Sequence, residues 1–350
     1  MKIGIVTVYK SQNCGSYLQA WALKTILERL GCEVCFVPYK STSGSIVNII
    51  WKVLKCCIKL RFRTAIFLIN RKVMFNKAQR ELPIINISEN MDAYIFGSDT
   101  IWNFENPFFY SQKDFFIGKG ITQPRYTYAV SGGSTSSMYY ENDKNIKEEL
   151  EKFDRISVRD GYLKGILEEL FPKKQIVQVL DPTLLLTPSD YTSLISQSSS
   201  IKNYIFIYYF GNMPDKLFQQ LLIFARKQGL KLVNMGFPDK RFDYNITNSP
   251  EGFIKYFISA TYVITNTFHG CVFSVLFNKQ FITDGFNKRK VEDFISRYGL
   301  HTQYITDETT VEEILTQSID YKTINDRIEK DREISLHFLN EIVSTKGMRL

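Results

Sequence analysis

The order of short apolar runs and helix-length segments is the feature that most limits what this chain can fold into. Apolar, β-rich runs recur along it: KIGIVTV, EVCFVPY, DAYIFGS, RYTYAVS and DRISVR in the first half, then NYIFIYYF, LKLVNMG, YVITNT and QFITD. Between them lie segments with helical spacing of apolar residues, such as SYLQAWALKTILERLG, which ends at Gly31. This alternation predicts an α/β protein with largely parallel sheets.

The length of 350 residues suggests two domains, each large enough to bury its own core. Two prolines in QIVQVLDPTLLLTPSDY interrupt the alternation, and we place the domain boundary there. We predict a first domain at residues 1–180, a second at 181–320, and a C-terminal helix at 321–350 that packs back on the first domain. Helices are expected at about 214–228, 250–259, 268–277 and 288–297, with a helical, amphipathic tail from about 309.

Charge is concentrated in one segment. Nine of the 44 lysines and arginines lie between residues 41 and 80, which contain no aspartate or glutamate. The other 35 are balanced by 36 acidic residues, so the formal net charge of +8 belongs to this segment. A nucleic-acid-binding surface, which spreads basic residues over a broad face, is therefore disfavoured, and we expect no nucleic-acid partner.

The basic segment has the pattern of an amphipathic helix. In IVNIIWKVLKCCIKLRFR, one helical face carries Lys52, Lys55, Lys59 and Arg63, and apolar residues occupy the rest. Such a helix can lie on an anionic membrane surface, with Trp51 near the headgroups. The alternatives are an ordinary domain helix with a solvated basic face and, more weakly, an RNA-binding segment.

The sequence shows neither an export signal nor a membrane span. The apolar run in MKIGIVTVYK is too short for a signal peptide, and no run of about 18 or more uncharged apolar residues occurs. The six cysteines form no disulfide framework, and the Cys32/Cys35 pair has no second pair to complete a zinc site. We therefore expect a cytoplasmic protein without a bound metal.

Polar residues follow two strands of the first half, at the edge where α/β sheets bind ligands. The loop SQNCGSY brings Asn13 and Ser16 to the start of a helix, where backbone amides suit an anion. DAYIFGSDTIWN supplies Asp99, Trp102 and Asn103 after an apolar strand. A turn with a helix cap explains Asp99 equally well.

Glycines and an arginine follow the next two strands. In YAVSGGS, Gly132 and Gly133 offer unobstructed amides that suit a phosphate or a sugar, and equally a plain turn. In DRISVRD, Arg159 comes directly after a strand and can clamp a carboxylate or phosphate. A surface ion pair with Asp160 or Glu168 is the alternative for this arginine.

One of only three histidines lies in TNTFHGCVFS, where a strand ends and an apolar helix begins. A helix N-terminus favours a bound anion, so His269 suits a neutral imidazole that hydrogen-bonds a phosphate or moves a proton. A histidine that merely caps the helix is the alternative. Lys288, Arg289 and Lys290 follow the next strand and either complete a cationic pocket or form a solvated basic turn.

Taken in order, these segments resemble the polysaccharide pyruvyl transferase family. The matching stretches are NCGSYLQAWAL, FGSDTIWN, YAVSGGS, ISVRDGY, VLDPTLLL and SPEGFIKYFISATYVITNTFHGCVFSVLFNKQFI, followed by KVEDFISRYGL. They extend from residue 13 to about residue 300, nearly the whole chain. The resemblance implies a glycosyltransferase-B-like fold, with two Rossmann-like domains facing a cleft, the acceptor on the first and the donor on the second.

The resemblance also implies a reaction. Pyruvate would pass from phosphoenolpyruvate, a co-substrate, to two hydroxyls of a sugar in a bacterial surface polysaccharide or its lipid-linked precursor, forming a cyclic ketal without a cofactor. In the family an arginine, a histidine and a later lysine hold the donor, and Arg159, His269 and Lys290 match them. Some members carry an arginine shortly before the histidine, where this chain has the residues 266–268, NTF.

We assign roles on this basis. His269 binds the donor phosphate with a role in proton transfer, and Asp99 is the base on the acceptor side. The other donor-binding candidates are Arg159, Lys290, Arg289, Gly132 and Gly133, and the other acceptor-binding candidates are Asn13, Tyr17, Trp102 and Asn103. The acceptor would be a lipid-linked oligosaccharide of galactose or N-acetylmannosamine type, and residues 46–80 would dock at the inner face of the cytoplasmic membrane.

Two other functions fit the sequence less well. A nucleotide-sugar-dependent glycosyltransferase would share the two-domain cleft but needs carboxylates for the ribose, and Glu251 and Asp239 are only loose candidates. A non-catalytic binding protein would keep the fold without the reaction.

Overall fold

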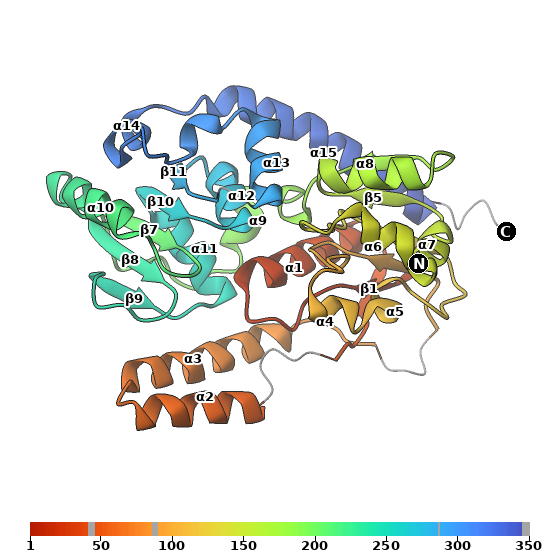
Figure 1. Cartoon of the computed structure of the whole chain (residues 1–350), viewed down its shortest axis with the longest axis horizontal. Coiled ribbons are helices and arrows are strands. Elements are labelled where there is room, and N and C mark those ends of the chain that lie inside the picture. The colour runs from red at the N-terminus through yellow and green to blue at the C-terminus, as the bar shows by residue number, and fades with distance from the viewer. Residues whose placement is uncertain (41–45, 86–89, 286–287, 345–350) are drawn as a thin grey trace.

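The computed structural model describes residues 1–40, 46–85, 90–285 and 288–344. Two α/β units lie side by side, a pair of helices projects from the first, and a long C-terminal helix crosses both units (Figure 1). All strand pairs in the named sheets are parallel. The predicted α/β class is confirmed.

The first unit is built on a four-stranded sheet with the order β2-β1-β3-β4. These strands are β1 (Lys2–Val6), β2 (Glu33–Phe36), β3 (Ala93–Phe96) and β4 (Arg125–Thr127). A second pair, β5 (Ile156–Val158) and β6 (Ile176–Gln178), continues the sheet through isolated bridges that join the β4 region to β5. Strand β6 lies in QIVQV, where the prolines nearby had suggested a boundary and no strand was predicted.

Helices surround this sheet. They are α1 (Cys14–Arg29), α4 (Pro107–Tyr110), α5 (Lys113–Phe116), α6 (Ser137–Asn142), α7 (Lys144–Glu151) and α8 (Gly161–Leu170). Helix α1 is mostly buried because it also contacts elements beyond the first sheet, namely η1 (Pro182–Leu184) and α11 (Pro250–Ser259). It is therefore the helix through which the two units meet.

The second unit has a five-stranded sheet with the order β11-β10-β7-β8-β9. Its strands are β7 (Tyr204–Tyr208), β8 (Lys231–Met235), β9 (Tyr244–Ile246), β10 (Tyr262–Thr265) and β11 (Gln280–Thr283). Its other helices are α9 (Pro188–Thr192), α10 (Asp215–Lys227), α12 (Phe268–Leu276), α13 (Arg289–Tyr298), η2 (His301–Gln303) and α14 (Val311–Thr316). Strand β9 was not predicted, because it is short and largely exposed and so lacks an apolar run.

The basic segment is two helices rather than one. Helix α2 (Ile46–Ile58) ends before Leu60, whose φ of 52° turns the chain, and α3 (Phe62–Gln79) returns beside it. Arg63 therefore lies on a different helix from Lys52, and the expectation that both share one helical face is wrong. We call α2 and α3 the hairpin.

The tail is also divided, into α14 and the 24-residue α15 (Tyr321–Ser344). Near its middle α15 is tied to the second unit by the Arg297–Asp331 salt bridge of 2.9 Å. Further along, Ser335 Oγ accepts a hydrogen bond of 2.9 Å from the Leu180 amide, and Leu339 is fully buried. The helix thus spans both units on one side of the molecule.

A single hydrophobic core extends through both units. It combines residues of the first sheet, of α1, of α12 and of α15 in one contiguous cluster, and a smaller cluster lies on the other face of the second sheet. The two units are consequently held by apolar packing as well as by the polar contacts between them. No helix in the described ranges is long and apolar enough to cross a membrane.

Helix α15 should contribute to global stability. Leu339→Ala, which removes a fully buried side chain, is expected to lower the free energy of unfolding by about 2–5 kcal/mol in a urea titration. Ile334→Ala on the same helix is the control, because Ile334 is 50% exposed and its loss should change stability by roughly 0.5 kcal/mol or less. Equal effects of the two changes would contradict the packing of α15.

Candidate functional site

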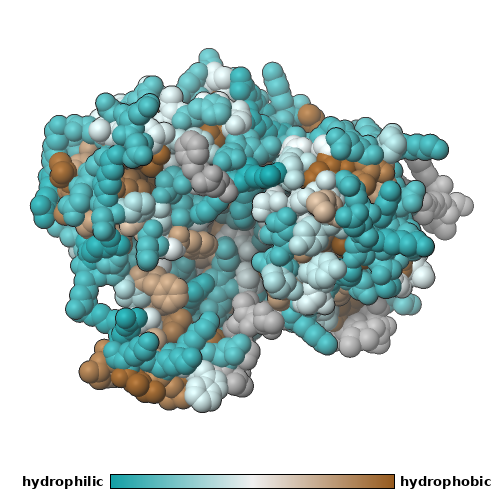
Figure 2. Space-filling model, in the orientation of Figure 1, coloured by the Kyte–Doolittle hydropathy of each residue, from teal (hydrophilic) through white to brown (hydrophobic). Residues whose placement is uncertain are grey.

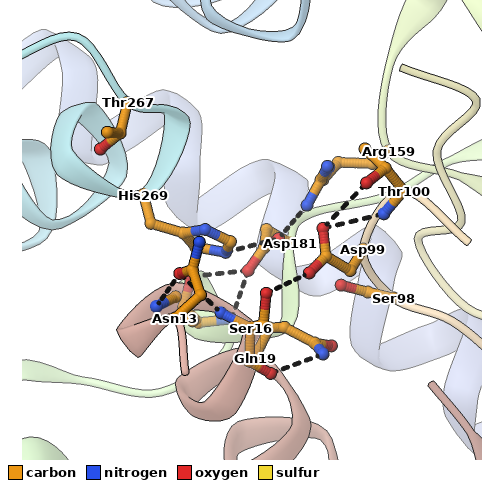
Figure 3. A network of polar contacts seen from close by, with 12 residues as sticks. Asn13, Ser16, Gln19, Ser98, Asp99, Thr100, Arg159, Asp181, Thr267 and His269 are labelled. Atoms are coloured by element: carbon orange, nitrogen blue, oxygen red, sulfur yellow. Dashed lines mark hydrogen bonds and ion pairs between the residues drawn. The ribbon is translucent and has the colours of Figure 1, made fainter. Parts of the chain in front are cut away.

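His269 lies where the two units meet. It is the second residue of α12, directly after β10, and its side chain is buried. The cap of this helix is Thr267, whose Oγ1 accepts a hydrogen bond of 2.9 Å from the Gly270 amide. The interpretation of His269 as a cap is therefore wrong, and its imidazole is directed at the first unit (Figure 3).

A buried carboxylate joins the two units. Asp181, 2% exposed, accepts a hydrogen bond of 2.7 Å from Arg159 Nη1 and lies 3.5 Å from His269 Nε2. Figure 3 shows the three side chains converging from different elements. Asp181 belongs to the VLDPTLLL stretch, but it was not predicted as a site residue, because a residue before a proline reads as a turn.

The surface ion pairs considered for Arg159 are absent from the described structure. Asp160 instead caps α8, accepting from the Leu163 amide at 2.9 Å, and Glu168 pairs with Lys164. Arg159 is 5% exposed, and its ion-pair partner among the described residues is Asp181. Arg159 lies directly after β5, as predicted. Its ion-pair partner is Asp181 rather than Asp160 or Glu168.

Asp181 binds only Nη1 of Arg159, and the other two nitrogen donors of the guanidinium are Nε and Nη2. Nε and Nη2 are buried and have no hydrogen-bond partner among the described residues, while the guanidinium lies 4.2 Å from the centre of the Phe268 ring. Nε and Nη2 form one edge of the planar guanidinium, the geometry that binds carboxylate or phosphate in a bidentate manner. A buried, unused pair of charged donors is costly unless an anion binds there.

Asp181 stays ionised in this setting. Burial alone would raise the pKa of its carboxyl, but the charges of His269 and Arg159, with a hydrogen bond from Thr183 Oγ1, outweigh burial and hold the pKa well below its ordinary value. The carboxylate therefore contacts both Arg159 and His269 and keeps Nη1 of the arginine occupied. Nε and Nη2 are thus directed away from Asp181.

Asp99 lies at the same junction. Ser16 Oγ donates to its Oδ2 at 2.7 Å and the Thr100 amide to its Oδ1 at 2.8 Å. Its φ of 74° is left-handed, a conformation that residues other than glycine adopt at a cost. Burial would raise the pKa of Asp99, but the charges of Arg159, Lys290 and His269 lower it overall, so Asp99 acts as an ionised acceptor.

The three basic residues at 288–290 have different surroundings. Lys288 Nζ donates to the Asn266 carbonyl at 2.7 Å, and the Arg289 guanidinium covers the Tyr162 ring at 4.0 Å. Lys290 lines the small pocket that Arg159 and Asp181 also line, and burial lowers its pKa despite the attraction of Asp99. Of the three, Lys290 faces the cluster, while Arg289 is engaged with Tyr162.

The starts of α1 and α12 approach each other closely. A Cβ atom added to Gly15 would lie 2.1 Å from His269 Nδ1, so only glycine fits. Asn13 caps α1, and its Oδ1 accepts from the Gly15 and Ser16 amides at 2.8 and 3.3 Å. Those two amides are therefore not available to an anion, contrary to the expectation for this loop.

Three of the predicted acceptor-binding residues make hydrogen bonds within the first unit. Trp102 is fully buried, with Nε1 donating to the Phe116 carbonyl at 3.0 Å, and Tyr17 is buried with its hydroxyl donating to the Ala78 carbonyl at 3.1 Å. Asn103 Oδ1 accepts from the Thr135 hydroxyl at 3.0 Å. The assignment of Trp102 and Tyr17 to an acceptor surface is wrong, because both belong to the core.

The two glycines of SGGS are needed for packing. A Cβ on Gly132 would lie 2.3 Å from the Tyr140 hydroxyl oxygen, and Gly133 has a φ of 64°. The Gly133 amide donates to Ser131 Oγ at 3.1 Å. This amide is therefore engaged within the loop, and the prediction that it binds the donor is wrong.

A cavity of about 810 Å³ lies between the hairpin and the second unit. Phe67 and Arg71 of α3 line one side, and the loops after β7 and β8 line the other, including Phe237 and Arg241. Arg71 also donates to the Gln12 carbonyl, next to the cap of α1, and so ties α3 to the loop that precedes α1. The sequence could not reveal the cavity, because it depends on where the hairpin packs.

The sequence model for polysaccharide pyruvyl transferases matches residues 13–283, more than half of the chain. The chain belongs to the polysaccharide pyruvyl transferase family. His269, Asp181, Arg159 and Asp99 all fall within the matched residues, and so does the hairpin. No curated protein matches this pyruvyl transferase family member significantly.

Solved structures show the fold of this pyruvyl transferase family member. A putative UDP-N-acetylglucosamine 2-epimerase from Listeria monocytogenes aligns with a TM-score of 0.54 at 9% identity, over 100% of this chain and 97% of that one. The UDP-GlcNAc 2-epimerase of Neisseria meningitidis aligns at 0.50 and 8% identity over all of both chains. A UDP-bound α-glucosyltransferase aligns at 0.50 and 9%, over 98% and 95%. The predicted glycosyltransferase-B-like fold is confirmed.

The close approach of Gly15 to His269 can be tested by adding one methyl group. Gly15→Ala is expected to destabilise the protein by roughly 1–3 kcal/mol through overpacking and to disturb the cluster. Gly165→Ala is the control, since a Cβ there meets nothing within 4 Å and a helical alanine stabilises by about 0.5–1 kcal/mol. Thermal unfolding of both variants measures the difference, and a neutral Gly15→Ala would refute the contact.

Asp181 should make the free energy of unfolding depend on pH in the acidic range. Because folding lowers its pKa, its ionised form stabilises the fold above about pH 4, and this contribution is lost as the pH falls. Asp181→Asn should cost about 3–5 kcal/mol near pH 7, since Arg159 loses its buried partner, and should flatten the loss of stability below about pH 5. Urea unfolding at several pH values measures both effects.

The control for Asp181→Asn is the same change at Asp239, which pairs with Arg241 in a partly exposed position. Surface pairs contribute about 0–1 kcal/mol, so Asp239→Asn should alter stability little at any pH. If the two variants had the same acid profile, Asp181 would not be the residue responsible.

Proposed function

We propose that this protein transfers pyruvate from phosphoenolpyruvate to two hydroxyls of one sugar, forming a cyclic ketal on a surface polysaccharide or its lipid-linked precursor. The observation that carries the proposal is the unpartnered Nε and Nη2 edge of Arg159, buried beside Lys290 and His269. A ligand with two anionic groups fits this set better than a neutral one. Family membership supports the same reaction class.

The electrostatics of the cluster support this donor. Phosphoenolpyruvate carries close to three negative charges, and Arg159, Lys290 and His269 supply donors or positive charge from both units. Asp181 neutralises part of that charge while it fixes the arginine and the histidine. Burial lowers the pKa of Lys290, and a bound anion would raise that pKa by favouring the charged form.

The proposed reaction conserves atoms and protons in three steps. A proton adds to the methylene carbon of phosphoenolpyruvate, which becomes the methyl group, and positive charge develops on the adjacent carbon. One sugar hydroxyl attacks that carbon and loses its proton, the bond to the phosphate oxygen breaks, and the phosphate leaves with the electron pair. The second hydroxyl then closes the ring. One hydroxyl proton balances the methyl proton, and the other leaves with the phosphate.

Two residues have the positions for proton transfer in this scheme. His269 is proposed to bind the phosphate and deliver or accept its proton, since Asp181 orients its ring from Nε2. Asp99 is proposed to accept the hydroxyl proton, because it is ionised and its oxygens are held by Ser16 and Thr100. Asp99 is a weak base, which suffices where the attacked carbon is cationic.

The acceptor is proposed to be a galactose or N-acetylmannosamine unit on a lipid-linked oligosaccharide, which places the protein in the cytoplasm at the inner membrane face. The cavity beside the hairpin suits such a ligand, since aromatic rings such as Phe67 and Phe237 can stack on sugars and Arg71 and Arg241 can meet phosphate. The carboxylates considered for a nucleotide ribose are engaged: Asp239 with Arg241 and Glu251 with Ser196.

The experiment is phosphate release from phosphoenolpyruvate with a panel of lipid-linked galactosides and N-acetylmannosamine acceptors. Acceptor-dependent release, with an acid-labile pyruvate ketal in the product, is expected for at least one acceptor. Sugar transfer from a UDP-sugar without use of phosphoenolpyruvate would establish the glycosyltransferase alternative instead. Donor binding without turnover of any acceptor would favour the non-catalytic alternative.

His269→Ala should lower kcat/KM for phosphoenolpyruvate by about 100-fold or more, because a phosphate contact and a proton-transfer group are both lost. His337→Ala is the control, since that histidine is on α15 and its side chain is 77% exposed.

In contrast, Asp99→Asn should lower kcat with little change in the KM for the donor. Near-normal turnover by either site variant would remove that residue from the mechanism.

A further inference from the structure

The hairpin presents apolar side chains to solvent on both of its helices. On α3 they lie at helical spacing, four and three residues apart, as Phe62, Ile66, Ile69 and Val73. On α2 they are Ile50, Trp51, Leu54 and Ile58. Trp51 is 61% exposed and Ile58 80%, so these side chains do not belong to the core. Figure 2 shows the resulting hydrophobic surface along the lower edge of the molecule, where Figure 1 places the hairpin.

The charged residues of the segment that carries this apolar surface are all basic. Residues 41–80 carry nine lysines and arginines and no carboxylate, and the hairpin includes Lys52 and Lys55 on α2 and Arg63 on α3. Exposed lysines on a soluble helix are commonly paired with acidic residues three or four positions away. No such pairing is possible within this segment, so its own charges are all of one sign.

Helix α3 holds the hairpin on the body, and Phe67 in its first half contacts Phe237 of the second unit. The C-terminal half of α3 is anchored through Phe75, which is fully buried, and through the Ala78 carbonyl, which accepts from Tyr17. Helix α2 packs against α3. The exposed side chains of α2 therefore cover no part of either α/β unit, and folding of the body does not account for them.

We propose that the hairpin docks this protein on an anionic lipid bilayer. The exposed apolar side chains would enter the interface between headgroups and acyl chains, and the lysines and arginines would meet anionic headgroups. The paired stripes on two helices give a broader contact than one amphipathic helix would. The inference deepens the proposed function, because the acceptor proposed there is carried on a membrane lipid.

Charge argues for lipid over the other occupants of such a surface. A second copy of the chain would bring two uniformly positive hairpins together, and like charges repel. A nucleic acid would be attracted by the basic residues but offers no apolar environment for Ile58 or Val73. An anionic bilayer satisfies both the charge and the exposed apolar area.

Docking would also place the cavity at the membrane. Helix α3 carries Ile66 and Ile69 on its exposed side and contributes Phe67 and Arg71 to the cavity wall. Phe67 contacts Phe237 of the second unit, with ring centres 5.2 Å apart, so the same helix touches both the proposed bilayer face and the cavity. A lipid-borne sugar phosphate would thus reach the cavity without leaving the membrane surface.

Co-sedimentation with vesicles tests the proposal. The full chain should bind phosphatidylcholine vesicles that contain phosphatidylglycerol, bind pure phosphatidylcholine vesicles much more weakly, and be released at high salt. Changing Lys52, Lys55 and Lys59 together to Gln should weaken binding on the order of 100-fold, at roughly fivefold per charge. Trp51→Glu with Ile58→Glu should abolish it.

Matched controls separate docking from general effects. Lys173, Lys202 and Lys231, all exposed and outside the hairpin, provide a triple Gln variant with the same charge change. Ile223→Glu, at a side chain 65% exposed on α10, is the control for the apolar change. Both controls should bind vesicles like the wild type, and thermal unfolding should show that all variants are folded.

The outcomes are distinguishable from those of the proposed reaction. Hairpin variants should keep phosphate release with a soluble acceptor, and His269→Ala should keep vesicle binding. Equal binding to neutral and anionic vesicles, or unchanged binding by the triple lysine variant, would overturn the proposal. A wild-type dimer that the Trp51/Ile58 change converts to a monomer, without vesicle binding, would assign the surface to a second copy and overturn it as well.

Discussion

The rest of the site depends on one buried carboxylate. Asp181 lies between an arginine that follows a strand of the first sheet and a histidine that opens a helix of the second unit. It contacts both side chains in a setting with little water, and by occupying one edge of the arginine it leaves the other for a ligand. A site assembled from two units needs a group that contacts both of them, because each side chain otherwise moves with the unit that carries it.

Much of the fold was accessible from the sequence, and the reason is periodicity. Strands buried on both faces must be continuous apolar runs, and amphipathic helices must repeat every three or four residues, so β7, β10, α12 and α13 were recognisable. The elements that were missed lack this signal. Strand β9 is exposed, and α2 and α3 are both so apolar and basic that the break at Leu60 is not visible in the pattern.

The site was accessible only in part, for a related reason. Position after a strand selected His269, Arg159 and Asp99, which the structure brings to one junction, because the carboxyl edge of a parallel sheet is fixed by topology. Which of the neighbouring polar residues face the cleft is decided by packing, and Trp102 and Tyr17 turned inward. Asp181 was hidden for the opposite reason: its role arises from contacts with residues 22 and 88 positions away, which no local pattern contains.

The contact between Gly15 and His269 limits how this architecture can vary. Two helices from different units begin so close together that the distance between the units is set by the absence of a side chain at one position. A change at residue 15 would act as a spacer, separating every pair of groups that face each other across the junction. The spacing of the groups on the two sides of this junction therefore depends on Gly15, which has no part in the proposed chemistry.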